Sequence, residues 1–385
     1  MSLQRSATTA RGLALDALVR IEHGAYANLL LHGLLARSGL SRRDRAFVTD
    51  LVYGTTRMRR ACDWLLAPHV RRPLDDDVRA ALRLGTYQLA VAGTSPHAAV
   101  AATVEAASPR ARGLVNAVLR KVASALPPEW PDDAVKLSYP DWMVERLAAD
   151  LGRVAALTAL GEMNRPAPAA EREDGYVQDE ASQWVAALVE AGAGDRVGDV
   201  CAAPGGKATF LAGVAGRRSL VVAGDVHEQR ARVVAANAAR LGLSNVVTIV
   251  ADGRREPVRR AALDRVLVDA PCSGLGALRR RPDARWRVGP DDVGRLAVLQ
   301  RQLLEGAAGC LRRGGTLVYS VCTMTVAETV EIDEWLAEHH PDLVALDPPD
   351  SPWARHGRGA LLLPQAAGTD GMYVLRLRRP SGRRQ

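Results

Sequence analysis

Two cysteines stand at the ends of hydrophobic runs, where a thiol could act as a nucleophile. Cys272 follows "RVLVDAP" and Cys322 ends "GTLVYSVC". Free cysteine has a pKa of about 8.5, so a fraction of it is thiolate, the reactive form, at neutral pH. A buried cysteine often serves instead as a small apolar core residue, and this is the role that we expect for Cys62 and Cys310.

A glycine-containing turn and three acids follow hydrophobic runs and could bind a cofactor. The turn lies in "DVCAAPGGKATFLAG", where small residues let the backbone approach a ligand and the following helix supplies N–H groups. Its candidate binding residues are Cys201, Ala202, Ala203, Pro204, Gly205, Gly206 and Lys207. The acids are Asp225, Asp252 and Asp269, and Asp225 has the spacing at which a carboxylate accepts hydrogen bonds from ribose hydroxyls.

These residues predict a nucleoside-containing cofactor at the carboxyl ends of the strands. Nicotinamide or flavin is the rival cofactor. The turn lacks the G-x-G-x-x-G pattern, however, because Cys201 and Ala203 occupy the first glycine positions. The G-x-x-x-x-G-K-[ST] spacing of a phosphate-binding loop is absent as well.

Hydrophobic runs alternate with helical periodicity in the second half of the chain. The runs are 196–201, 219–225, 246–250, 265–271, 315–322 and 372–378, and the helical stretches are 206–215, 227–241, 290–311 and 326–338. This alternation predicts an α/β Rossmann-like domain with a parallel, doubly wound sheet. In a 3-2-1-4-5 strand order the fourth and fifth strands are neighbours, which places Cys272 and Cys322 in one crevice beside the cofactor.

A thiolate beside a methyl donor suits the methylation of cytosine at C5. Addition of the thiolate at C6 makes C5 an enamine-like carbon that can attack a methylsulfonium. A carboxylic acid near N3 stabilises the adduct, and Asp269 is well placed for that role. One cysteine must add and the other could assist its release, but the order along the chain does not rank Cys272 and Cys322.

The first part of the chain reads as helix after helix. Residues 10–125 carry apolar stripes at helical spacing, one of which is Leu114, Ala117, Val118 and Val122. They predict an all-α domain. We therefore divide the chain into an all-α domain at 1–126, a linker with a short helical connector at 127–175, and the α/β domain at 176–385. Within the connector, "NRPAPAAEREDG" (164–175) is expected to be a polar link.

Composition narrows the class of protein. The net charge of +8 favours a nucleic-acid partner. The five cysteines form no C-x-x-C pair, so we expect neither a disulfide framework nor a bound metal. No apolar run is long enough to cross a membrane. The first residues, 1–15, lead into an amphipathic helix rather than a transit peptide, and we expect a cytoplasmic monomer.

Several motifs resemble those of the bacterial Sun/Fmu-type RNA (cytosine-5) methyltransferases, which modify 16S ribosomal RNA. These motifs are "VQDEASQ", "DVCAAPGGKAT", "GDVHEQR", "VLVDAPCSGLGALRRRPDARW", "LVYSVCTMTVAE" and "DGMYVLRLRR", and together they span essentially all of 176–380. In the helical part, "SRRDRAFVTDLVYGTTR" and "RGLVNAVLRKV" are similar to the NusB-like RNA-binding domain that this family carries in front.

The resemblance implies both a cofactor and catalytic roles. S-adenosylmethionine would bind to residues 201–207 with Asp225, Asp252 and Asp269. Cys322 would be the nucleophile and Cys272 would help to break the covalent adduct. Two alternatives stay open: a transfer RNA substrate, and a non-catalytic RNA-binding or ribosome-assembly protein. The second is motivated by the short 164–175 segment, where family members carry a longer one.

Arginine clusters predict RNA contacts. The loop 277–287 carries five arginines directly after the Cys272 strand end, so we expect it at the crevice, with Trp286 stacking on a base. A second cluster in the helical domain consists of Arg57, Arg59, Arg60, Arg71 and Arg72.

Overall fold

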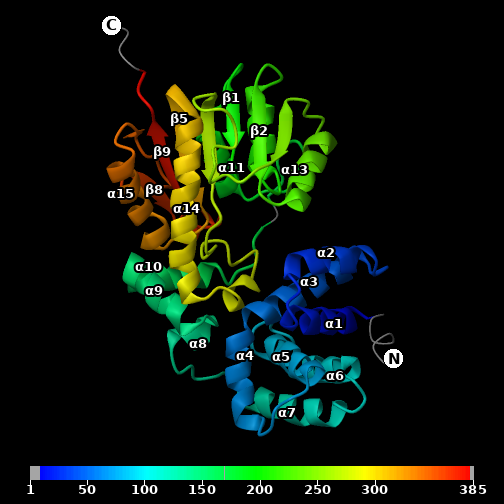
Figure 1. Ribbon diagram of the computed structural model, residues 1–385. Helices are drawn as coiled ribbons and strands as arrows, with labels where there is room; N and C mark the ends of the chain where they lie inside the picture. The colour runs from blue at the N-terminus through cyan, green and yellow to red at the C-terminus, as the bar shows by residue number, and fades with distance from the viewer. Residues whose placement is uncertain (1–8, 169, 382–385) are drawn as a thin grey trace. The chain divides into compact units, whose positions relative to one another are not determined.

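The chain forms two compact units, coloured by residue number in Figure 1. The computed structural model describes residues 9–168 and 170–381. One unit holds the residues up to Glu145 together with Arg280–Arg287, and the other holds Arg146–Arg279 and the residues from Val288 onward. The connector predicted at 127–175 is thus divided between the two units, and part of the predicted α/β domain belongs to the helical unit.

The first unit is built from helices. They are α1 (Ala10–Glu22), α2 (Ala27–Ala36), α3 (Arg42–Arg57), α4 (Arg59–Leu66), α5 (Asp76–Ala90), α6 (Pro96–Ala106), α7 (Arg112–Ser124) and α8 (Asp133–Leu137), while α9 (Asp141–Leu151) spans the division between the units. Side-chain caps begin α1, α3 and α8, and at α8 the Asp132 carboxylate accepts the N–H of Val135 (2.7 Å). The Thr9 hydroxyl accepts the N–H of Gly12 (3.1 Å) at α1, and the Ser41 hydroxyl accepts that of Asp44 (3.1 Å) at α3.

Two apolar clusters hold these helices together. One collects buried residues of α1 to α5, such as Leu13 and Leu51, and the other collects residues of α5, α6 and α7, such as Leu82. Burial of each such leucine contributes about 1.5–3 kcal/mol relative to leaving it in water. Cys62 lies in the first cluster and is 1% exposed, which confirms its predicted role as a core residue.

The apolar stripe predicted for α7 is partly wrong. Leu114 is 46% exposed, and Ala117 is exposed as well. The buried face consists of Val115, Val118, Leu119 and Val122, which pack in the cluster with α5 and α6. Adjacent apolar residues allow more than one stripe on a helix, and the neighbouring helices select which of them is buried.

The second unit contains a sheet of nine strands. The strands are β1 (Arg196–Asp199), β2 (Leu220–Asp225), β3 (Val246–Val250), β4 (Leu263–Asp269), β5 (Leu311–Val321), β6 (Val344–Ala345), β7 (Ala354–His356), β8 (Gly359–Leu362) and β9 (Met372–Arg378). Their order is β3-β2-β1-β4-β5-β9-β8-β7, and β6 pairs with β9. The first five strands are parallel in the predicted 3-2-1-4-5 order.

The sheet is mixed rather than purely parallel. β9 runs antiparallel to β5, and β8 and β7 continue antiparallel beyond it. β6, β7 and β8 were not predicted, because each has four residues or fewer and no helix separates them from one another, whereas helices separate most of the parallel strands.

Helices cover both faces of this sheet. The helices of this unit that follow α9 are α10 (Arg153–Glu162), α11 (Glu180–Ala187), α12 (Gly206–Ala215), α13 (Glu228–Arg240), α14 (Pro290–Cys310), α15 (Val330–His339) and α16 (Pro364–Ala367). Val318 of β5 packs in one apolar cluster with α11 and α12. The next residue, Tyr319, donates its hydroxyl to Gln300 of α14 (2.9 Å), so α14 lies on the opposite face (Figure 1).

The segment 280–287 packs into the helical unit through a buried arginine. The Arg285 guanidinium donates to the carbonyls of Arg57 (3.1 Å) and Ser138 (3.0 Å) and to the Tyr139 hydroxyl (2.9 Å). It also lies 3.8 Å from the centre of the Tyr139 ring. Burial lowers the pKa of Arg285 to about 10, which leaves it charged at neutral pH. The expectation that this arginine contacts RNA is therefore wrong.

Replacing Arg285 should destabilise the helical unit. Arg285→Ala leaves two buried carbonyls without their donor and removes the ring contact, and we expect a loss of about 3 kcal/mol. Native-state hydrogen exchange of the α3 and α4 amides measures this loss. Arg281→Ala, at an exposed position of the same segment, is the control. Equal protection in the two variants would contradict the structural role of Arg285.

Candidate functional site

The turn after β1 brings the start of α12 to the carboxyl edge of the sheet. Gly205 has φ +106°, and a Cβ there would lie 3.3 Å from the Cα of Val234, so this position requires glycine. The N–H of Ala202 donates to the carbonyl of Gly224 (2.8 Å) and ties the turn to the end of β2. Burial raises the pKa of the Cys201 thiol, which therefore lines the turn as a neutral group.

Each of the four adjacent strands β3, β2, β1 and β4 carries an acid at or just beyond its carboxyl end. Asp225 ends β2, is buried, and accepts the N–H of His227 (2.9 Å). Asp252 follows β3 and is paired with Arg254 (2.7 Å), whose hydrogen bonds lower the pKa of Asp252 to about 2. The remaining two acids are Asp199 at the end of β1 and Asp269 at the end of β4.

Asp199 is a functional candidate that the sequence analysis missed. It is 1% exposed, and neither of its carboxylate oxygens makes a hydrogen bond of good geometry among the described residues, although the backbone N–H of Cys201 is near enough to favour its charged form. Burial, followed by the nearby charge of Asp269, raises the pKa of Asp199 to about 7. A buried carboxylate without a partner is costly, so this position is suited to a ligand that brings a positive charge or N–H groups. Its place at a strand end, like that of the three predicted acids, was the signal available in the sequence.

The two candidate thiols lie together at the same edge. Cys272 Sγ and Cys322 Sγ are 3.4 Å apart, and both residues are half-buried. The hydrogen bond to Cys322 and burial together raise the pKa of Cys272 well above its ordinary value. The Cys272 thiol therefore keeps its proton at neutral pH.

Lys207 and Asp269 form an ion pair at this edge. The Lys207 ammonium lies 2.6 Å from Asp269 Oδ2 and donates to the Ser182 hydroxyl (2.7 Å). The Ser320 hydroxyl donates to Asp269 Oδ1 (2.8 Å). Although burial alone would lower it, the Asp269 carboxylate raises the pKa of Lys207 above its ordinary value. Lys207 was predicted to bind the cofactor, but its ammonium is directed to Asp269.

A buried carboxylate ties together the two thiol loops, which follow β4 and β5 and carry Cys272 and Cys322. Glu328 is 0% exposed and accepts hydrogen bonds from the Ser273 N–H (2.8 Å) and hydroxyl (2.5 Å), from Gln300 (3.0 Å) and from the Thr325 hydroxyl (2.9 Å). Ser273 follows Cys272 directly, and Thr325 stands in the loop that follows Cys322. The sequence analysis did not single out Glu328, which appears there only within the motif "LVYSVCTMTVAE". Its partners Ser273 and Gln300 lie far away in the chain, so the sequence does not show that they meet.

Backbone hydrogen bonds add a third segment to this scaffold. The N–H of Gly276 donates to the carbonyl of Cys322 (2.9 Å), and the N–H of Gly371 donates to the carbonyl of Gly276 (2.9 Å). A Cβ at Gly276 would lie 2.2 Å from the Gly371 carbonyl oxygen, so only glycine permits this approach.

The arginine that begins the predicted RNA loop is structural. Arg279 is 3% exposed and pairs with Asp370 (3.0 Å) and Asp179 (3.7 Å). Because Arg279 and Arg285 are both buried in contacts with protein, the prediction of a loop with five arginines available to RNA is wrong.

The segment predicted as a polar link contributes to the site as well. Arg172 is buried and donates to the carbonyl of Gly206 (2.7 Å) and to Gln178 (3.0 Å), beneath the start of α12. The link 164–175 therefore braces the glycine turn, apart from position 169, which lies outside the described residues.

Within residues 9–168 and 170–381, no group of three or more His, Cys, Asp or Glu side chains could hold a metal ion. In the same ranges no helix is both long and apolar enough to cross a membrane.

Similarity to known proteins identifies the family of this chain. Residues 186–378 match the family model described as 16S rRNA methyltransferase RsmB/F. The chain is 39% identical to the ribosomal RNA small subunit methyltransferase B of Thermus thermophilus, over 97% of this chain and 98% of that protein. The chain belongs to the RsmB/F family of 16S rRNA methyltransferases. This confirms the family resemblance read from the motifs.

Further relatives extend the match to the whole chain. The RsmB/F protein is 32% identical to ribosomal RNA small subunit methyltransferase B of Enterobacter sp. (strain 638), over 95% of this chain and 98% of that protein. Residues 8–124 match the NusB family, so a NusB domain precedes the α/β methyltransferase domain, as predicted. The solved structure of PH0851 has the same fold, with a TM-score of 0.80 and 22% identity over 98% of this chain and 99% of that one.

Replacing Asp199 should remove a pH-dependent part of stability. The carboxyl ionises at about pH 7 in the folded chain but near 3.8 when unfolded. Raising the pH from about 4 to 7 therefore favours unfolding by up to about 1.4 kcal/mol per pH unit. Urea unfolding of the sheet unit across this range should show the decline in the wild type and much less of it in Asp199→Asn. Asp291→Asn, at an exposed position, is the control. The same decline in Asp199→Asn would contradict the assignment.

Replacing Glu328 should separate the two thiols. Glu328→Ala leaves the buried donors of Ser273, Gln300 and Thr325 without an acceptor, and we expect a loss of about 3 kcal/mol. Phenylarsine oxide bridges two sulfur atoms only when they lie close together, so titration with it reports their proximity. We expect tight one-to-one binding in the wild type and in the exposed control Glu331→Ala, and weaker binding in Glu328→Ala. Unchanged binding would show that other contacts hold the thiol loops.

Proposed function

We propose that this RsmB/F family member transfers a methyl group from S-adenosylmethionine to C5 of a cytosine in 16S ribosomal RNA, through a covalent bond between Cys322 and C6 of the base. The observation that carries the proposal is the 3.4 Å separation of the Cys272 and Cys322 sulfur atoms, at a sheet edge where Asp269 is also held. A nucleophile, a second thiol and an acid are what this reaction needs within reach of one pyrimidine ring.

The cofactor fits the residues at the neighbouring strand ends. We assign the carboxylate of Asp199, which lacks a partner among the described residues, to the positively charged amino group of S-adenosylmethionine. Asp225 and Asp252 are assigned to the nucleoside part, and the small residues Cys201, Ala202, Ala203, Pro204, Gly205 and Gly206 to the wall that the cofactor approaches. When bound, S-adenosylmethionine supplies an electrophilic methyl group on a sulfonium.

Cys322 is the better nucleophile of the two thiols. Either sulfur could donate across the 3.4 Å contact, and we assign the S–H of Cys272 as the donor, because its raised pKa keeps its proton in place; this bond favours negative charge on the Cys322 sulfur. As the Cys322–C6 bond forms, the electrons of the C5–C6 double bond move to C5, which becomes the carbon that is methylated. This ranking agrees with the role that the resemblance implies.

Asp269 and Lys207 act on the other side of the pyrimidine ring. Charge that develops toward N3 during thiolate addition needs a proton or a strong hydrogen bond. Asp269 is assigned to N3: the Lys207 ammonium, 2.6 Å from its carboxylate, passes a proton through Asp269 to N3 as the adduct forms and takes it back when the adduct breaks. We therefore place Lys207 with the substrate rather than with the cofactor.

Breakdown of the adduct restores the aromatic cytosine ring and frees Cys322. A general base removes the proton from C5, the C5–C6 double bond forms again, and the Cys322–C6 bond breaks with its electron pair on sulfur. The Cys272 thiol, 3.4 Å away, stabilises the departing thiolate by donating a hydrogen bond. The products are 5-methylcytosine in the RNA, the thioether that remains when S-adenosylmethionine has lost its methyl group, and one proton.

The remaining parts of the chain are assigned to holding RNA. We propose residues 1–126 as an RNA-binding domain and 176–385 as the catalytic domain, joined through 127–175. The match of residues 8–124 to the NusB family and the net charge of +8 support this division.

Substitution of each cysteine should give a distinct result. Cys322→Ala should lose methyl transfer by at least a thousandfold, because no covalent bond can form. Cys272→Ala should bind C6 but release it slowly, so that a protein–RNA adduct persists on denaturing gels with 16S rRNA and S-adenosylmethionine. Cys310→Ala, at a buried position at the opposite end of β5 from Cys322, is the control. Normal turnover by Cys322→Ala would exclude the proposed mechanism.

The substrate is tested in cells. Bisulfite mapping of total RNA from a strain that lacks this protein should show the loss of one or more methylcytosines in 16S rRNA. Complementation with the wild-type gene should restore the mark, and complementation with Cys322→Ala should not. Loss of a transfer RNA mark in place of the ribosomal one would overturn the assignment of the substrate.

A further inference from the structure

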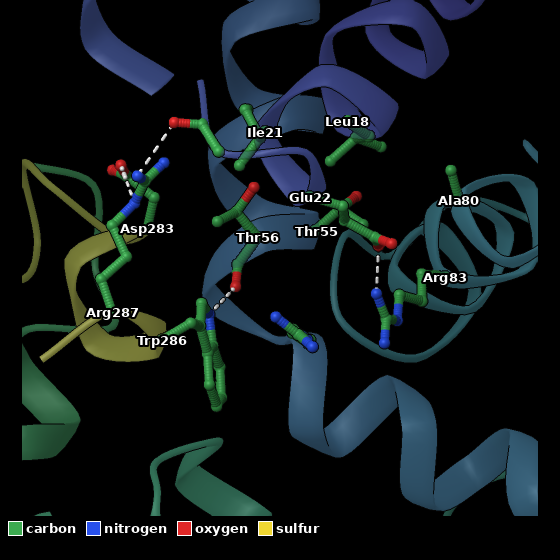
Figure 2. Close-up of a pocket in the computed structure, with 12 residues that line it drawn as sticks. Leu18, Ile21, Glu22, Thr55, Thr56, Ala80, Arg83, Asp283, Trp286 and Arg287 are labelled. Atoms are coloured by element: carbon green, nitrogen blue, oxygen red, sulfur yellow. Dashed lines mark hydrogen bonds and ion pairs between the residues drawn. The ribbon is translucent and has the colours of Figure 1, made fainter. Parts of the chain in front are cut away.

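The helical unit contains a partly open pocket of about 150 Å³ that the proposed reaction does not use. Its walls come from α1, α3, α4, α5 and the segment 280–287, all of which belong to that unit. Figure 2 shows Leu18, Ile21 and Glu22 of α1 on one side and Trp286 with Asp283 on another, with Thr55 and Thr56 between them. A cavity of roughly 150 Å³ is large enough to bind benzene, and therefore accommodates one six-membered ring.

Three polar groups in the lining have no hydrogen-bond partner in the part of the chain that the structure describes. The hydroxyls of Thr55 and Thr56 are buried, at 2% and 6% exposure, and neither makes a hydrogen bond there. The guanidinium of Arg59 is half-buried, and its one recorded contact is with the Trp286 ring, 5.5 Å from the ring centre. Buried polar groups in native proteins normally have partners, so the two threonine hydroxyls indicate a ligand, and Arg59, which also lies near the charges of Asp63 and Glu22, borders the same space.

The other charged groups of the lining are already neutralised. Arg83 pairs with Glu22, and Arg287 pairs with Asp283 at 3.2 Å, as Figure 2 shows. Two carboxylates in the wall make the pocket a poor site for a phosphate. The lining includes the apolar side chains of Leu18, Ile21 and Ala80 as well. A neutral, partly apolar ligand is favoured over an anion.

One wall of the pocket is a fixed aromatic ring. The indole N–H of Trp286 donates to the carbonyl of Thr56 (2.7 Å), which holds the ring against α3 (Figure 2). The neighbouring Arg285 is buried and anchors the segment in the same unit. A planar surface that is already ordered binds a flat ligand with little further loss of side-chain entropy.

We propose that this pocket binds one unpaired nucleobase of the RNA substrate, of pyrimidine size, with Trp286 as the stacking surface and Arg59, Thr55 and Thr56 as the groups that hydrogen-bond its edge. A guanidinium donates to the carbonyl oxygens and ring nitrogens of a base, and hydroxyls either donate or accept. The proposal rests on the proposed function, in that the substrate is RNA. It assigns to Trp286 a base-binding role within the helical unit.

Photo-crosslinking of the full chain tests the pocket. The probe is 16S rRNA transcribed with 4-thiouridine at a fraction of its uridines, irradiated with the protein and analysed by mass spectrometry of the crosslinked peptides. We expect a crosslink to the peptide that contains Trp286 or to the one that contains Thr55 and Thr56. If neither peptide is crosslinked while crosslinks form elsewhere on the chain, the proposal is overturned.

Three variants separate base recognition from folding and from net charge. Thr56→Val is isosteric and removes a hydroxyl that has no partner among the described residues, so the fold should be unaffected while RNA affinity falls about fivefold. Arg59→Ala should lower affinity about tenfold, as expected for loss of a base contact. Arg120→Ala removes the same charge from an exposed position of the same unit, outside the arginine clusters, and should leave the crosslink in place. Equal RNA affinity in all three variants would contradict the proposal.

The dependence of affinity on salt distinguishes a base from a phosphate. Loss of a base contact weakens binding equally at all salt concentrations, whereas loss of a phosphate contact reduces the slope of log K against log [salt] by about one. We expect Arg59→Ala to keep the wild-type slope, and a reduced slope would overturn the assignment to a base. The outcome is separable from the proposed function, because adduct formation by Cys272→Ala is scored independently of the crosslink at Trp286.

Discussion

The register between β4 and β5 is the constraint on which the site depends. Asp269 is the register partner of Ser320 across these two parallel strands, so the chain leaves both strands at the same level of the sheet. From there each strand is followed within a few residues by its cysteine, and the two sulfur atoms come to 3.4 Å. A slip of one residue would turn every side chain of one strand to the opposite face and separate the pair. The buried carboxylate of Glu328 and the backbone bonds of Gly276 hold the loops after that exit.

Electrostatic asymmetry divides this edge into two halves. On the β4 side, Asp269 is matched by the Lys207 ammonium at 2.6 Å. On the β1 side, Asp199 is buried without a matching donor in the described residues, which costs stability in the protein alone and favours a cationic ligand. The two carboxylates interact with one another, since Asp269 contributes to the raised pKa of Asp199. A bound positive charge near Asp199 would relieve the repulsion between its carboxylate and that of Asp269.

The segment 280–287 connects the catalytic loop along the chain to the helical unit. The chain leaves the sheet unit after Arg279, contributes Arg285 and Trp286 to the core and pocket of the helical unit, and returns to the sheet unit at Val288. Arg279 and Arg285, which the sequence suggested as RNA contacts, are thus buried and stabilise the fold. The donors of Arg285 satisfy backbone carbonyls, which a lysine could not do with the same planar geometry. The unpaired groups around Trp286 give this segment a role in recognition that differs from nonspecific phosphate contact.

Local patterns in the sequence determined much of the second unit. Alternation of strand and helix, glycine at a left-handed position in the turn, and a cysteine at each of two strand ends are properties of short stretches of chain. They sufficed for the 3-2-1-4-5 order and for the placement of the two thiols. What only the tertiary structure decided depends on partners far away in the chain. The burial of Arg285 by Tyr139, the missing partner of Asp199, the bonds to Glu328 and the antiparallel pairing of β9 with β5 are of this kind. Such features arise because burial and hydrogen bonding are set by whichever segments meet in space, and non-local pairings leave no periodic signal in the residues themselves.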